Sequence, residues 1–288
     1  MTKKSSTPQN CHELGSASGK REVCKILEQG QSKIFFRSAT EYLRRSKIQK
    51  IVTLSLLFMV AFGSGAEAEK KADPERWINE AEAALAQAEN YSAIFRKQER
   101  IKGKLMEEET VLFKFKRPFK VYMKWIKNPY KGREVLYVEG WNKNLMKVHG
   151  SGITGMVTVN LDPKGSLAMR GCRHPIKDSG LDHLVKVIGN NVRSGMKSGE
   201  LDFREEVEET VYGRRTQRME IILPRDKTRG YYSYRARLSL DIEKKVPIKV
   251  QIYDWDNNLV EDYGYEDLKL NANLTDADFS PKNPEYRF

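Results

Sequence analysis

Apolar and polar side chains alternate along much of the chain, most clearly between positions 110 and 125. In 110–116, and again after Pro118, every second residue is apolar and the residues between are mostly lysines. A period of two predicts antiparallel strands with one buried face. The apolar face of these two segments consists of Val111, Phe113, Phe115, Phe119, Val121, Met123 and Trp125.

The same pattern predicts most of the other elements. Asp73 and Pro74 are typical of a helix start, and the apolar positions that follow predict a helix ending near Asn90. A second helix is predicted over 178–198. Further strands are predicted over 134–140, 144–149, 207–212, 218–223, 232–242, 246–252, 259–265 and 268–274. The fold class is therefore mainly β (α+β). We expect an open antiparallel half-barrel of about 9–11 strands, with two or three helices covering its concave face.

A short apolar run near the N-terminus predicts export. Residues 51–62 are apolar apart from Thr53 and Ser55, and basic residues precede them. The run is shorter than the about 20 residues that cross a bilayer, and small residues follow it. We expect a secretory signal peptide at 46–68, cleaved after Ala68, and a periplasmic product. A short buried helix or an uncleaved anchor is the alternative.

This prediction divides the chain into three parts. Residues 1–45 are expected to be a disordered extension or to precede the true start, and 69–288 to form a single domain. No cysteine follows the apolar run at the cleavage point, so no lipid anchor is expected.

Charge changes the picture only slightly. The net charge of the whole chain is +12, but residues 1–68 carry 11 basic and 5 acidic residues, so the predicted mature chain has a net charge of +6. A mild, dispersed excess suits an anionic partner such as a lipid headgroup surface. In an exported protein it does not indicate a nucleic-acid partner, and we expect a monomer.

Candidate catalytic chemistry is sparse. His149, His174 and His183 lack the spacing of metal ligands, so we expect surface or turn histidines, with no metal and no cofactor. Neither a Gly-x-Ser-x-Gly motif nor a phosphate-binding glycine loop occurs. The three glutamates at 107–109 are expected in a solvated loop. Cys172 is expected to be a small buried residue or a free thiol.

Six short segments carry a family resemblance. They are YSAIF (91–95), QER (98–100), FKRPFKVYMKW (115–125), LYVEGWN (136–142), LTDADF (274–279) and NPEYRF (283–288). The chain from about 91 to 288 resembles a bacterial family of unknown function that is grouped with the LolA-like lipoprotein carriers. The resemblance implies an unclosed barrel with helices in its mouth, and a cavity that in the carriers takes lipoprotein acyl chains. Arg117-Pro118 is similar to a pair in the carriers, whereas 172–174 has no counterpart there.

We therefore expect a periplasmic, non-enzymatic carrier or binding protein for a lipid or an acylated protein. The apolar face of 111–125 defined above is expected to line the groove, and Arg117 and Lys120 to meet a headgroup phosphate at its rim. The same apolar face is also compatible with an ordinary sealed core.

Two other hypotheses remain open. In the first, the chain is an envelope interaction module that binds a membrane-anchored protein or a cell-wall polymer through exposed Lys120, Tyr122 and Lys124 on the convex face. In the second it is a hydrolase, which would require His149 or His174 to pair with a carboxylate and a hydroxyl in a polar cleft.

Overall fold

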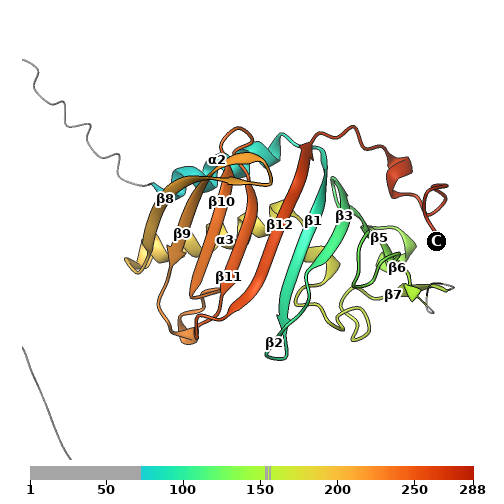
Figure 1. Ribbon diagram of the computed structural model, residues 1–288, viewed down its shortest axis with the longest axis horizontal. Helices are drawn as coiled ribbons and strands as arrows, with labels where there is room; N and C mark the ends of the chain where they lie inside the picture. The colour runs from blue at the N-terminus through green and yellow to red at the C-terminus, as the bar shows by residue number, and fades with distance from the viewer. Residues whose placement is uncertain (1–72, 153–154, 156) are drawn as a thin grey trace, which may run out of the picture. The chain divides into compact units, whose positions relative to one another are not determined.

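The computed structural model describes residues 73–152, 155 and 157–288, and the predicted signal peptide lies outside the described residues. The described part contains the α-helices α2 (Pro74–Ala86) and α3 (Leu181–Ser198) and a large antiparallel sheet (Figure 1). In this part of the chain, no helix has the length and apolar character needed to cross a membrane. The strands are β1 (Asn90–Ile101), β2 (Lys104–Leu105), β3 (Glu109–Lys116), β4 (Lys120–Trp125), β5 (Glu134–Val138), β6 (Met146–His149), β7 (Thr158–Leu161), β8 (Asp202–Val211), β9 (Arg214–Ile222), β10 (Arg235–Asp241), β11 (Pro247–Tyr253) and β12 (Leu259–Leu270).

The sheet is open, as predicted. Its strand order is β7-β6-β5-β4-β3-β1-β12-β11-β10-β9-β8, and β2 pairs with β1. Among the described residues the sheet has 12 strands, slightly more than the nine to eleven expected. The excess comes from β1 and β2. Because β1 pairs with both β3 and β12, it lies at the centre of the sheet.

The central strand β1 is the main error of the sequence prediction. The first helix was expected to end near Asn90, but it ends at Ala86 and β1 begins at Asn90. Tyr91, Ala93 and Phe95 alternate as buried residues, but the next inward positions are charged, which conceals the strand in the sequence.

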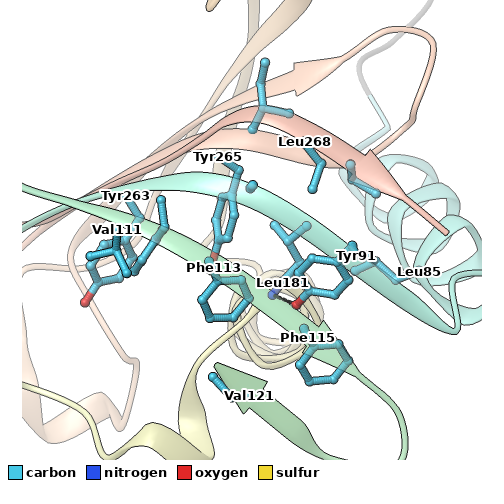
Figure 2. Close-up of a cluster of buried hydrophobic side chains, with 14 of the residues drawn as sticks. Leu85, Tyr91, Val111, Phe113, Phe115, Val121, Leu181, Tyr263, Tyr265 and Leu268 are labelled. Carbon is cyan, nitrogen blue, oxygen red and sulfur yellow. Dashed lines mark hydrogen bonds between the residues drawn. The ribbon is translucent and has the colours of Figure 1, made fainter. Parts of the chain in front are cut away.

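Each helix start has a local cause. The Asp73 carboxylate accepts hydrogen bonds from two backbone N–H groups of α2, which confirms the predicted cap. The second helix begins at Leu181 rather than 178, and the Tyr91 hydroxyl accepts its first N–H at 2.9 Å (Figure 2). Gly180 has φ +101°, and a Cβ there would lie 2.5 Å from the Tyr91 hydroxyl oxygen. The start of α3 is therefore fixed against β1.

Both helices cover one face of the sheet, as expected (Figure 1). Leu85 of α2 and Leu181 of α3 belong to a buried cluster with aromatic residues of β1 and β3 (Figure 2). In this cluster the Tyr91 and Phe115 rings stack with centroids 4.8 Å apart. The cluster is therefore a packed core beneath the helices.

The opposite, convex face of β3–β5 is covered by the C-terminal segment. The Tyr286 ring stacks on Tyr122 at 3.8 Å, and Tyr122 is fully buried. Lys120 forms an ion pair with Asp276 at 2.7 Å, and Lys124 lies 3.2 Å from Glu134. The expectation that Lys120, Tyr122 and Lys124 form an exposed binding face is therefore wrong, because the chain's own C-terminus occupies that face.

Candidate ligand-binding cavity

A cavity of about 780 Å³ lies between the concave face of the sheet and the chain from 161 to 188. This volume falls within the range of about 300–1,000 Å³ that is usual for small-molecule sites. Several strands, the helix α3 and the segment before it contribute apolar side chains to the wall. They include Phe95, Val111, Met123, Trp125, Val135, Met146, Val148, Leu161, Ala168, Ile176, Leu184, Ile188, Ile252 and Tyr265.

The cavity reaches solvent through an apolar mouth. Four of its hydrophobic lining residues are exposed: Val157 at 57%, Val159 at 41%, Leu167 at 60% and Tyr130 at 38%. Exposed aliphatic side chains around an opening are typical of binding sites. We call these four residues the mouth.

Only some of the predicted groove residues line the cavity. Val111, Met123 and Trp125 do so, and Val111 and Trp125 are at the same time members of the buried cluster under the helices. Phe113, Phe115 and Val121 lie in the buried cluster under the helices, and Phe119 packs against it (Figure 2). Alternation identifies the inward face of a strand, but not which part of that face a helix covers.

The two predicted rim residues lie elsewhere. The Arg117 guanidinium donates to the carbonyl oxygens of Leu85 and Ala88, each at 2.9 Å, and pairs with Asp182 of α3. Arg117 therefore joins the end of α2 to α3. Lys120 is on the convex face with Asp276 because successive side chains of a strand point to opposite faces. Neither residue contributes to the cavity wall.

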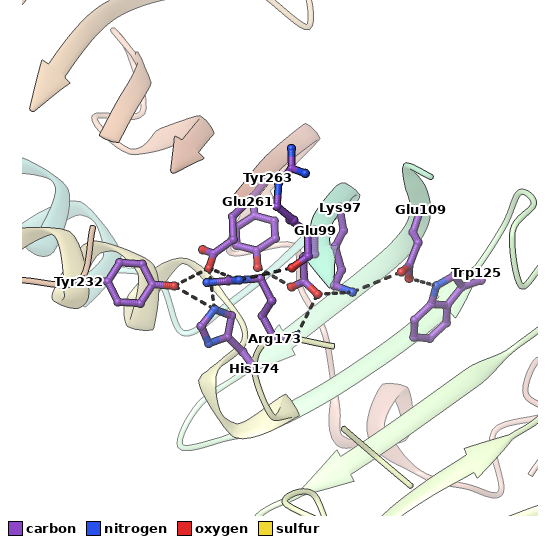
Figure 3. A network of polar contacts seen from close by, with 10 residues as sticks. Lys97, Glu99, Glu109, Trp125, Arg173, His174, Tyr232, Glu261 and Tyr263 are labelled. Atoms are coloured by element: carbon purple, nitrogen blue, oxygen red, sulfur yellow. Dashed lines mark hydrogen bonds and ion pairs between the residues drawn. The ribbon is translucent and has the colours of Figure 1, made fainter. Parts of the chain in front are cut away.

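A network of charged side chains forms one part of the wall (Figure 3). In the sheet register Lys97 of β1 lies opposite Glu109 of β3. The Lys97 ammonium is 3.1 Å from a Glu99 oxygen and 3.3 Å from a Glu109 oxygen. The other Glu109 oxygen accepts a hydrogen bond of 2.6 Å from the Trp125 indole. This contact fixes the orientation of the Trp125 ring.

The second half of the network fastens the segment 172–176 to the sheet. Arg173 donates from its backbone N–H to Glu99 at 3.0 Å and from its side chain to Glu261 at 2.7 Å. The Tyr232 hydroxyl also donates to Glu261, at 2.6 Å, and the His174 ring nitrogen Nε2 lies 3.0 Å from the same oxygen (Figure 3).

These contacts shift the pKa values of His174 and Glu261. Burial alone would raise the pKa of Glu261, but hydrogen bonds from His174, Tyr232 and Arg173 hold it below the usual range. Burial alone would lower the pKa of His174, but Glu261 outweighs burial and raises it. The basic groups Lys97, Arg173 and His174 thus lie beside the three carboxylates of the network.

Sequence reasoning missed most of this network. Glu109 is 8% exposed, so the expectation of a solvated loop is wrong for it. His149 is buried and His174 half-buried, so neither is a surface histidine. The usable signal was the period of two, which continues from Phe95 into Lys97 and Glu99. Cys172 is half-buried at the cavity wall, and burial raises the pKa of its thiol.

The geometry around His174 does not fit a hydrolytic triad. Such a relay needs the carboxylate on one ring nitrogen and the nucleophile on the other. Here Glu261 and the Tyr232 hydroxyl both contact Nε2, at 3.0 and 2.9 Å. Burial and Glu261 also raise the pKa of Tyr232 well above its usual range. The cluster therefore serves to hold the chain over the cavity.

Fold and cavity together define a half-barrel protein with an internal, mainly apolar cavity. Residues 88–288 match a family described as protein of unknown function (DUF1571), and the chain belongs to this family. The resemblance of the sequence to a family of unknown function is thereby confirmed. No curated protein matches the chain.

Several solved structures are similar to the chain. MucB has 15% sequence identity over 73% of this chain, with a TM-score of 0.45, and this chain spans 63% of the MucB chain. The Mycobacterium tuberculosis lipoprotein LppX has 14% identity over 71% of this chain and 99% of its own, with a TM-score of 0.44. A LolA superfamily protein from Nitrosomonas europaea has 10% identity over 73% of this chain and 98% of its own, with a TM-score of 0.29.

Proposed function

We propose that the chain is a non-enzymatic binding protein that holds the acyl chain of a lipid or of an acylated protein in its cavity. The observation that carries this proposal is the cavity itself, which has an apolar wall and an open apolar mouth. The buried cluster under the helices includes cavity-lining residues such as Phe95, Trp125 and Tyr265, so one side of the cavity is formed by the packed core.

The energetics are favourable for a hydrocarbon chain. Each buried methylene contributes about 0.8 kcal/mol, so about ten contribute about 8 kcal/mol before the cost of immobilising the ligand. The predicted signal peptide supports a periplasmic location, where such a protein would carry or sense lipids or lipoproteins of the envelope.

Displacement of a fluorescent fatty acid tests the proposal. Ala168 lines the cavity, and an Ala168→Trp side chain would fill part of it. Ala86, at the exposed end of α2, gives the matched control Ala86→Trp. We expect Ala168→Trp to weaken binding at least about tenfold, equivalent to about 1.4 kcal/mol, and Ala86→Trp to leave it unchanged. Equal binding by both variants, or none by the unchanged protein, would contradict the proposal.

A further inference from the structure

We infer that Arg133 binds an anionic head group, so that the cavity takes amphiphiles with a carboxylate or phosphate on an apolar tail. This inference rests on the proposed function and names the class of ligand. Arg133 directly precedes β5 and lines the cavity.

The backbone of Arg133 is fixed by the turn between β4 and β5. Its carbonyl oxygen accepts from the Trp125 N–H at 2.9 Å, and its own N–H donates to Tyr130 at 3.0 Å. Tyr130 has φ +69° and Gly132 +89°, so the turn uses left-handed positions. The Arg133 side chain lies beside two aromatic rings, those of Tyr130 and Trp125.

The guanidinium is held by these rings rather than by a carboxylate. Its central carbon lies 4.0 Å from the Tyr130 ring centroid and 5.4 Å from the Trp125 centroid. Trp125 is itself fixed by Glu109. Stacking on aromatic faces leaves the edge of a guanidinium and its N–H donors available.

The charge of Arg133 is unpaired within the described part of the chain, where its guanidinium has no ion pair or hydrogen bond. Lys97, by contrast, pairs with Glu99 and Glu109. Arg170 also lines the cavity, but it is exposed to solvent and no aromatic ring among the described residues stacks on it. A guanidinium matches the two oxygens of a carboxylate or phosphate, so the free donors of Arg133 suit an oxyanion.

A cationic head group would find no comparable site at the network. Glu109 already accepts from Lys97 and Trp125. Glu99 accepts from Tyr263 and from the Arg173 backbone, and Glu261 is held as described above. The three carboxylates of the network are thus engaged, whereas the guanidinium of Arg133 is free to bind.

The wall beyond Arg133 suits the tail. Val135 of β5 is two residues further along the chain than Arg133 and also lines the cavity. In the sheet register it lies opposite Met123 of β4 and Val148 of β6, and all three line the cavity. Tyr130 belongs to the mouth. A head group at Arg133 is therefore near the opening, with its tail along these apolar side chains.

The test compares three ligands of one chain length: a fatty acid, a monoalkyl phosphate and the methyl ester of the fatty acid. We expect the unchanged protein to bind both anions at least about tenfold more tightly than the ester. Arg133→Gln should bind all three like the ester, and Arg133→Lys should keep part of the preference. The matched control is Arg225→Gln, because Arg225 also stacks on a tyrosine, 4.4 Å from the Tyr234 ring, but lies outside the cavity lining.

The outcomes separate this inference from the proposed function. Binding of all three ligands with equal affinity, or a preference for anions that survives Arg133→Gln, would overturn the role of Arg133 alone. Failure of the unchanged protein to bind any of them would overturn the proposed function as well. Ester binding shows that each variant is folded. Displacement of the fatty acid by inorganic phosphate would indicate a site for the free anion and would overturn the inference that the ligand is an amphiphile.

Discussion

Glu99 of β1 lies directly opposite Glu261 of β12 in the sheet, and both side chains are almost fully buried at the cavity wall. Like charges at such a cross-strand position destabilise a sheet. Arg173 reduces the repulsion between the two carboxylates, because its backbone N–H donates to Glu99 and its guanidinium donates to Glu261. The segment over the cavity is thus held by a charge arrangement that the sheet needs for its own stability.

Removing Arg173 should therefore destabilise the fold. Arg173→Ala is expected to lower the free energy of unfolding by about 2 kcal/mol, below the about 3–5 kcal/mol of a fully buried pair because the Arg173 side chain is 34% exposed. Urea unfolding measures this. The control Arg204→Ala breaks an exposed pair with Asp202 and should cost less than about 1 kcal/mol. Equal effects of the two substitutions would contradict the role given to Arg173.

The His174–Glu261 pair should make stability depend on pH. The raised pKa of His174 gives stability that is complete below about pH 6.5 and is lost as pH rises through its folded value. The lowered pKa of Glu261 gives stability that is present above about pH 4.3 and is lost as pH falls through its folded value. The stability difference between the unchanged protein and His174→Gln should therefore be largest between these two values.

This pH dependence reflects all the groups around the ring. Glu261 and Glu99 raise the pKa of His174, whereas Arg173 lowers it, and the ring lies beside the Tyr232 hydroxyl. Unfolding in urea at pH 5, 6, 7 and 8 follows the difference. A difference that grows steadily from pH 5 to pH 8 would show that His174 is not stabilised in its charged form.

The start of α3 should depend on the hydroxyl of Tyr91. Tyr91→Phe leaves the buried N–H of Leu181 without its acceptor and should cost about 1–3 kcal/mol in unfolding free energy. Tyr265→Phe in the same core is the matched control and should cost less. Gly180→Ala should also destabilise, since its Cβ would collide with the Tyr91 hydroxyl. Similar values for the two tyrosine substitutions would contradict the capping role.

The C-terminal segment should contribute to stability but not to ligand binding. Tyr286→Ala removes a ring that stacks on Tyr122 and should cost about 3 kcal/mol. Because this stack lies on the convex face, fatty-acid binding by the folded variant should be unchanged. A parallel loss of binding would show that the convex face and the cavity are coupled.

Much of the fold was predictable from alternation. The strands around Phe113, Val121 and Val250 follow a strict period of two, and the helix cap at Asp73 follows a known preference. The central strand β1 was not predicted, because Lys97 and Glu99 occupy inward positions that the pattern reserves for apolar residues. A strand with inward charged residues can be recognised only when the residues that pair with those charges on other strands are known.

The candidate site was less predictable for the same reason. Sequence pattern placed Val111, Met123 and Trp125 on the correct face but could not separate them from Phe113 under the helices. Arg133 gave no sequence signal, since its role depends on two aromatic side chains that come close to it only in the folded chain. Such facts belong to tertiary structure.

The most direct test of the account is native mass spectrometry of residues 69–288, purified from a periplasm without detergent, with lipid extraction of the same sample. The account predicts an adduct that extracts as a fatty acid or an anionic lipid and that is lost in Ala168→Trp but kept in Ala86→Trp. An adduct-free protein that also binds no added fatty acid would contradict it.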